Sequence, residues 1–189
     1  MSTPIDLEQV HIVAYGLNEV IDEAFHLLQG IMAFGEKYPD KVILPLESDW
    51  YALAYSALLK SLVIETASLL DRAKYRKDSN CNFRELQEVL ESNTDKHKYQ
   101  KSIDQIENLL KEYDNLIPDV LRNKIVAHRD LEKLFANEEY GINLIEITRF
   151  LLEGHIIISD VLELSVGAKL ANPDLDSIKR IYEKSLVLL

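Results

Sequence analysis

Apolar residues recur at steps of three and four along most of the chain, which is the spacing of one face of an α-helix. The first run covers residues 6–36 and ends near Gly35 and Pro39. The second, from about residue 48 to Tyr75, is apolar on several sides and predicts a central, well-buried helix. Similar runs predict helices over residues 83–91, 94–113 and 142–166.

Polar and proline residues mark where several of these helices should begin or end. Asn82 precedes the run 83–91, and Glu85 follows three residues later, which is the spacing of an N-terminal capping pair. Pro118 lacks a backbone N–H, so it should end or kink the preceding helix. It suits the first turn of a new helix, which we expect over residues 118–128.

The last helix is predicted over residues 173–188, with Asn172 as its cap and Pro173 in its first turn. No segment shows the alternation of a β-strand, and no internal repeat is present. The pattern therefore predicts an all-α fold, a bundle of about six helices that forms a single domain over residues 1–189.

Composition narrows the class of protein further. The chain has only 6 Gly and 5 Pro, too few for the many turns of an all-β sandwich or barrel. The single cysteine, Cys81, cannot form an internal disulfide or a zinc site by itself, and its polar loop predicts a surface thiol. The N-terminus lacks the features of a secretory signal, and no uncharged apolar stretch could span a membrane. We expect a cytoplasmic protein without a metal or cofactor.

The acidic charge is unevenly distributed. With 21 Lys and Arg against 32 Asp and Glu, the formal net charge is −11. Residues 72–129 hold 12 basic and 10 acidic residues, a balance of +2, so the remainder carries −13. A strongly acidic protein repels nucleic acid at long range. Any contact with nucleic acid should therefore use the central third of the chain.

One segment in that third carries candidate chemistry, residues 120–130, with the sequence Val-Leu-Arg-Asn-Lys-Ile-Val-Ala-His-Arg-Asp. Arg122 is followed by the polar Asn123, and five residues separate Arg122 from His128. This pattern resembles the signature of the HEPN superfamily (higher eukaryotes and prokaryotes nucleotide-binding). Together with residues 65–72, which end in Asp-Arg, it is most similar to the abortive-infection (AbiU-type) branch, whose members are all-helical.

The placement of the two residues on one helix raises a geometric question. Arg122 and His128 are six residues apart, so on an ideal helix their directions differ by about 120°. They converge only if the helix ends at His128, or if two copies meet across a symmetric interface. The resemblance implies the second arrangement, in which two signature helices face each other in a homodimer and the site lies in the cleft between them.

The resemblance also implies metal-independent cleavage of RNA, in a toxin–antitoxin or phage-defence setting. His128 is the expected general acid or base, because imidazole exchanges protons near neutral pH. Arg122 would stabilise the charge on the phosphate, and Asn123 would orient a phosphate oxygen or His128. The 2′-hydroxyl is the nucleophile, so the product should end in a 2′,3′-cyclic phosphate.

Basic residues near aromatic ones could form an RNA groove, since lysine and arginine contact phosphates and tyrosine stacks on bases. The predicted RNA contacts are Arg72, Lys74, Arg76, Lys77 and Arg129, and Lys98 beside Tyr99.

The resemblance also implies an antitoxin protein as a partner. The tyrosine that such antitoxins modify just after the signature histidine is absent here, because Arg129 and Asp130 follow His128.

The alternative is a non-catalytic helical module that binds a nucleotide or a partner protein, in which Arg122 and His128 are structural. A solvated basic face is likewise an alternative to the RNA groove. Arg149 and His155 lie on the predicted apolar helix 142–166, and Gly154 and His155 interrupt its apolar seam. A polar residue in such a seam can fix the helix register or lie near the cleft. We interpret His155 as a core histidine.

Overall fold

Five α-helices make up most of the residues that the computed structural model describes, which are 5–37, 50–70, 81–117, 143–171 and 173. No strand occurs among these residues, so the predicted all-α bundle is confirmed. Five helices are described where about six were expected, and the segments 118–128 and 173–188 lie outside the described residues apart from Pro173. The helices are α1 (Ile5–Lys37), α2 (Trp50–Leu69), α3 (Phe83–Ser92), α4 (Lys96–Glu112) and α7 (Leu144–Val166).

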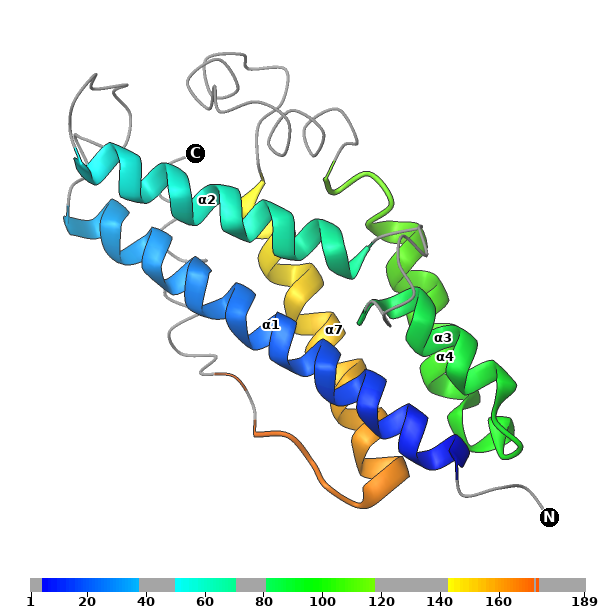
Figure 1. Ribbon diagram of the computed structural model, residues 1–189. Coiled ribbons are helices and arrows are strands. Elements are labelled where there is room, and N and C mark those ends of the chain that lie inside the picture. Colours follow the sequence, from blue (N-terminus) through cyan, green and yellow to red (C-terminus); the bar gives the residue numbers. More distant parts are fainter. Residues whose placement is uncertain (1–4, 38–49, 71–80, 118–142, 172, 174–189) are drawn as a thin grey trace.

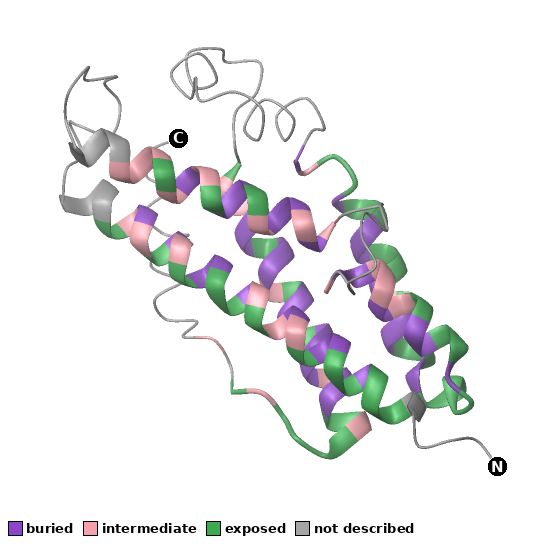
Figure 2. Cartoon of the chain, viewed as in Figure 1, coloured by how far each residue is buried: buried purple, intermediate pink, exposed green. Residues whose placement is uncertain are grey.

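The helix α1 has its main contacts with three of the other four described helices. Its apolar stripe is almost completely buried, as Leu17, Ile21 and Leu28 show, and the helix packs against α2, α3 and α7 (Figures 1 and 2). The helix α2 runs antiparallel along α1, because Leu58 contacts Gly30 and Glu65 lies near Glu23. Its main packing partner among the described helices is α1. That α2 is the central helix stays a prediction, because residues 118–142 and 174–189 lie outside the described chain.

The boundaries of the middle helices follow local polar chemistry. Asn82 accepts a hydrogen bond from the Glu85 N–H at 2.8 Å, which confirms the predicted cap of α3. The helix α2 ends at Leu69 rather than near Tyr75, since the Leu70 N–H turns to the Ala67 carbonyl in a tight final turn. The helix α4 ends at Glu112, before Pro118, so this proline does not end the helix.

Substitution of Asn82 tests how much its capping hydrogen bond stabilises the protein. Replacing Asn82 with alanine should lower the free energy of unfolding by about 1 kcal/mol, because the Glu85 N–H loses its acceptor in a buried setting. Asn82→Asp keeps an acceptor oxygen and should retain most of the stability. Urea denaturation of both variants checks this, and equal losses in the two would contradict the capping role.

The helix α7 joins α1 to the α3–α4 pair. The Asn143 side chain caps its first turn by accepting from the N–H groups of Ile145 and Glu146 at 3.1 and 3.2 Å. Gly154 allows the close approach of the helices, because a Cβ there would lie only 2.6 Å from the buried ring of Phe83. No helix in the described ranges combines the length and apolar character that crossing a bilayer requires.

Candidate functional site

The predicted catalytic segment falls between two described helices. Of the nine predicted site residues, Lys98 alone is described, so the structure does not test whether Arg122 and His128 converge. The two ends of the segment are nevertheless defined, because the described chain stops at the buried Ile117 and resumes at Asn143. The predicted residues outside the described part are Arg72, Lys74, Arg76, Lys77, Arg122, Asn123, His128 and Arg129.

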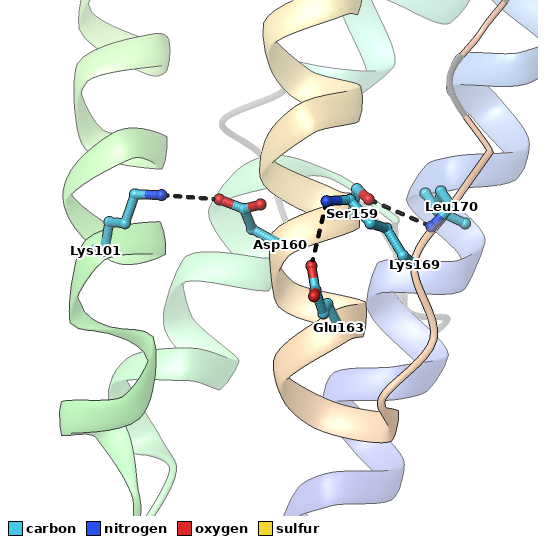
Figure 3. A network of polar contacts seen from close by, with 6 residues as sticks. All are labelled: Lys101, Ser159, Asp160, Glu163, Lys169 and Leu170. Atoms are coloured by element: carbon cyan, nitrogen blue, oxygen red, sulfur yellow. Dashed lines mark hydrogen bonds and ion pairs between the residues drawn. The ribbon is translucent and has the colours of Figure 1, made fainter.

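Two contacts hold α4 and α7 side by side, the helices that flank this segment. Lys101 forms an ion pair with Asp160 at 3.1 Å (Figure 3), and the Tyr113 hydroxyl donates to the Glu153 carboxylate at 3.1 Å. Later residues of α4 therefore meet earlier residues of α7, so the helices are antiparallel. The end of α4 and the start of α7 therefore lie at the same end of the described bundle, as Figure 1 shows.

The Tyr113–Glu153 hydrogen bond is more buried than the Lys101–Asp160 ion pair. The side chain is 6% exposed, and its ring meets Phe150 edge-on with 5.4 Å between the centroids. Burial and the hydrogen bond to the negative Glu153 carboxylate raise the pKa of Tyr113. The phenol therefore stays protonated at neutral pH and acts as a constant donor that holds the end of α4 on α7.

The second segment that resembles the family, residues 65–72, is described as far as Leu70. Glu65 lies half-buried on α2, where burial and the charge of Glu23 on α1 raise the pKa of its carboxyl group. This part of the segment is packed between helices, since Thr66, Ala67 and Leu69 are all buried. Its described residues therefore belong to the packed part of α2, and Asp71 and Arg72 lie outside the described chain.

Lys98 is the one predicted RNA contact within the described chain, and the tyrosine beside it does not face solvent. Lys98 is exposed, with its ammonium 5.5 Å from the centroid of the Tyr99 ring. Tyr99 itself is 0% exposed, so its ring cannot stack on a base, and that part of the prediction is wrong. It occupies a core position of α4, at the spacing that also buries Ile103 and Ile106. Residues 81–117 carry 5 basic and 8 acidic side chains, a balance of −3 that weakens attraction for phosphates.

Neither a metal site nor a groove of one charge occurs in the described part of the chain. A shallow groove of about 360 Å³ between α3 and α4 places two basic side chains, Arg84 and Lys111, beside two acidic ones, Glu107 and Asp114. No cluster of three metal-ligating side chains occurs within the described ranges.

Cys81 is half-buried with its Sγ against Gly16, and burial raises the pKa of its thiol. It is therefore a packing residue rather than the expected surface thiol.

Sequence reasoning did not identify the Tyr113–Glu153 contact or the close packing at Gly154. Tyr113 fits the apolar spacing of α4, which gives no indication that its hydroxyl pairs with another helix. Glycine within the apolar run of α7 was a visible signal, but the partner ring of Phe83 lies 71 residues away in sequence. Contacts of this kind depend on tertiary packing and leave no local pattern.

The sequence of the chain matches one known protein family. No curated protein and no solved structure matches the chain. One family model does, that of the AbiU2 HEPN proteins, and its match covers residues 17–184. It includes all five described helices in whole or part, as well as Arg122 and His128. The chain therefore belongs to the AbiU2 family of HEPN proteins.

Proposed function

We propose that the protein is a metal-independent endoribonuclease of a HEPN-type toxin or abortive-infection system. The observation that carries this proposal is the family match over residues 17–184, which contains the Arg122, Asn123 and His128 signature. His128 moves the proton of the 2′-hydroxyl or of the leaving 5′-oxygen. Arg122 stabilises the negative charge that builds on the phosphate, and Asn123 orients a phosphate oxygen or His128.

The proposed active form is a homodimer whose two signature segments share one cleft. Arg122 and His128 point about 120° apart on a single ideal helix, so a second copy supplies the missing convergence. Within one copy, the Lys101–Asp160 and Tyr113–Glu153 contacts hold together the two helices that flank the signature segment. An antitoxin protein with a basic surface is a further proposed partner, since the chain carries a net charge of −11.

The chemistry can be tested at a single phosphate. After a cleavage position is mapped in an RNA oligonucleotide, the 2′-hydroxyl at that position is replaced by hydrogen, and both substrates are incubated with the protein in EDTA. The unmodified RNA should be cut to a 2′,3′-cyclic phosphate end, whereas the 2′-deoxy substrate should resist at that position because it lacks the nucleophile. Equal cleavage of the two substrates, or cleavage only when divalent metal is present, would overturn the proposal.

A second candidate function is a non-catalytic module that binds a nucleotide or a partner protein. The acidic balance of residues 81–117 and the burial of Tyr99 favour it, because both weaken binding of RNA to that part of the surface. Thermal unfolding with and without nucleotides distinguishes the two. A nucleotide that raises the melting temperature of a protein inert toward RNA would support this second candidate.

A further inference from the structure

Three large apolar side chains that remain exposed lie close together on the first part of α1. Leu7 is 49% exposed, Ile12 55% and Tyr15 52%. The His11 ring lies beside Tyr15, with 6.0 Å between the two ring centroids. Because residues three and four apart are neighbours on a helix, these four side chains form one continuous surface, which we call the α1 patch.

A continuous apolar surface needs more explanation than scattered exposed side chains. Isolated exposed leucine or isoleucine residues are common on monomeric proteins, whereas contiguous apolar patches with a polar rim mark interaction sites. The α1 patch has such a rim, because Glu8 precedes Ile12 by one turn and Glu19 follows Tyr15 by one turn. Both glutamates are exposed, and exposed residues recur along this half of α1 in green in Figure 2.

The charge around the α1 patch is acidic. Residues 1–36 contain 6 Asp or Glu and no Lys or Arg. With Lys37 included, α1 carries a balance of −5, and no other described helix has so large an acidic excess. Neither Glu8 nor Glu19 forms an ion pair with another described residue. Burial and nearby negative charge, including that of Glu19, raise the pKa of Cys81, so the field of Glu19 reaches the residues just before α3.

This combination of apolar surface and negative charge disfavours two classes of partner. RNA carries phosphates, which an acidic surface repels. A second copy of the chain would present the same patch. In a symmetric pair of α1 helices, whether parallel or antiparallel, Glu8 and Glu19 would meet only glutamates across the interface. Like charges placed in this way oppose association.

We propose that the α1 patch is the docking surface for a basic amphipathic helix of a partner protein. The apolar side of that helix covers Ile12 and Tyr15, and lysine or arginine side chains at its edges reach Glu8 and Glu19. These two glutamates are separated by about 16 Å along α1, which a partner helix of about three turns spans. The assignment follows from exposure and charge and uses none of the signature residues, so it does not rest on ribonuclease activity.

Binding of a synthetic peptide to the full chain tests this surface. The probe is a labelled helical peptide of leucine and lysine, about five turns long, whose leucines fall on one face. A scrambled peptide of the same composition is its control. Fluorescence anisotropy at low salt should show that the amphipathic peptide binds about tenfold more tightly than the scrambled one, because only the first presents an apolar face. Equal affinity for the two peptides, or no binding of the amphipathic one, would overturn the proposal.

Two matched variants locate the binding surface. Ile12→Gln should weaken binding of the amphipathic peptide by about tenfold, because a polar side chain replaces an apolar contact. Ile156→Gln should leave binding unchanged, since Ile156 is also 55% exposed but lies on α7. Equal losses in the two variants would contradict the assignment to α1. A lower oligomeric mass of Ile12→Gln in the absence of peptide would also contradict it, because the patch would then join two copies.

A third variant tests the charges separately and keeps Ile12. Combined Glu8→Gln and Glu19→Gln replacements should weaken binding of the amphipathic peptide at low salt and have little effect at high salt, where exposed charges are screened. All the substituted side chains are exposed, so melting temperatures should stay close to that of the wild-type protein. Undiminished binding by this folded double variant at low salt would show that the partner need not be basic and would overturn the proposal.

Discussion

Replacing His128 with alanine should lower the rate of RNA cleavage by about 10²- to 10⁴-fold, the range that a positioned general acid or base contributes. Alanine cannot accept the 2′-hydroxyl proton or return a proton to the leaving oxygen. Arg122 is retained in this variant, so binding of the phosphate should survive better than turnover. Initial rates at saturating and at limiting RNA concentrations would separate these two effects.

The matched control is His97→Ala. His97 is exposed on α4, away from the signature segment in sequence, so its removal should leave both cleavage and stability nearly unchanged. Melting temperatures of both variants show whether each remains folded. Full activity in a folded His128→Ala protein would contradict the assignment, as would an equal loss in His97→Ala.

Replacing Phe150 with alanine should lower the free energy of unfolding by about 3–5 kcal/mol, the usual cost of deleting a buried aromatic ring. Phe150 is 0% exposed on α7, and its ring meets Phe83 at 5.8 Å and Tyr113 at 5.4 Å between centroids, edge-on in both cases. One ring thus connects α3, α4 and α7. Its removal leaves a cavity where these three helices meet.

Ile156→Ala provides the control on the same helix. Ile156 is 55% exposed, so its truncation should change the free energy of unfolding by only about 0.5 kcal/mol. Urea or guanidinium denaturation of both variants gives the comparison. A loss below about 1.5 kcal/mol for Phe150→Ala would show that the three helices depend little on this ring.

The helices were predictable because one-sided burial leaves a period in the sequence. The buried stripe of α1, through Leu17, Ile21 and Leu28, follows steps of four and seven. Asn82 identified the start of α3, since its cap involves residues only three apart. These features are local, and local sequence determines them.

The neighbours of each helix were not predictable in the same way. An apolar period shows that a face is covered and does not show what covers it, so the packing of α2 along α1 could not be predicted from the sequence. Tyr99 resembled a stacking residue because basic residues surround it in sequence, yet its own helical position directs it into the core. This error arises from tertiary packing that overrides local composition.

The candidate site likewise combines one feature that local sequence determines with one that it does not. The spacing from Arg122 to His128 is local, so the family could be inferred from it before any comparison was made, and the match over residues 17–184 bears that out. Convergence of the two side chains depends on a helix end or on a second copy, which no local pattern encodes. That part remains a prediction about the dimer.

The most direct test of the central claim is whether the purified wild-type protein cuts RNA in the presence of EDTA. Labelled RNA is incubated with protein shown to be folded and dimeric, and the product ends are identified by mass spectrometry. The proposed function predicts discrete cleavage with 2′,3′-cyclic phosphate ends. Intact RNA after prolonged incubation with the folded dimer, across substrates of varied sequence and structure, would contradict it.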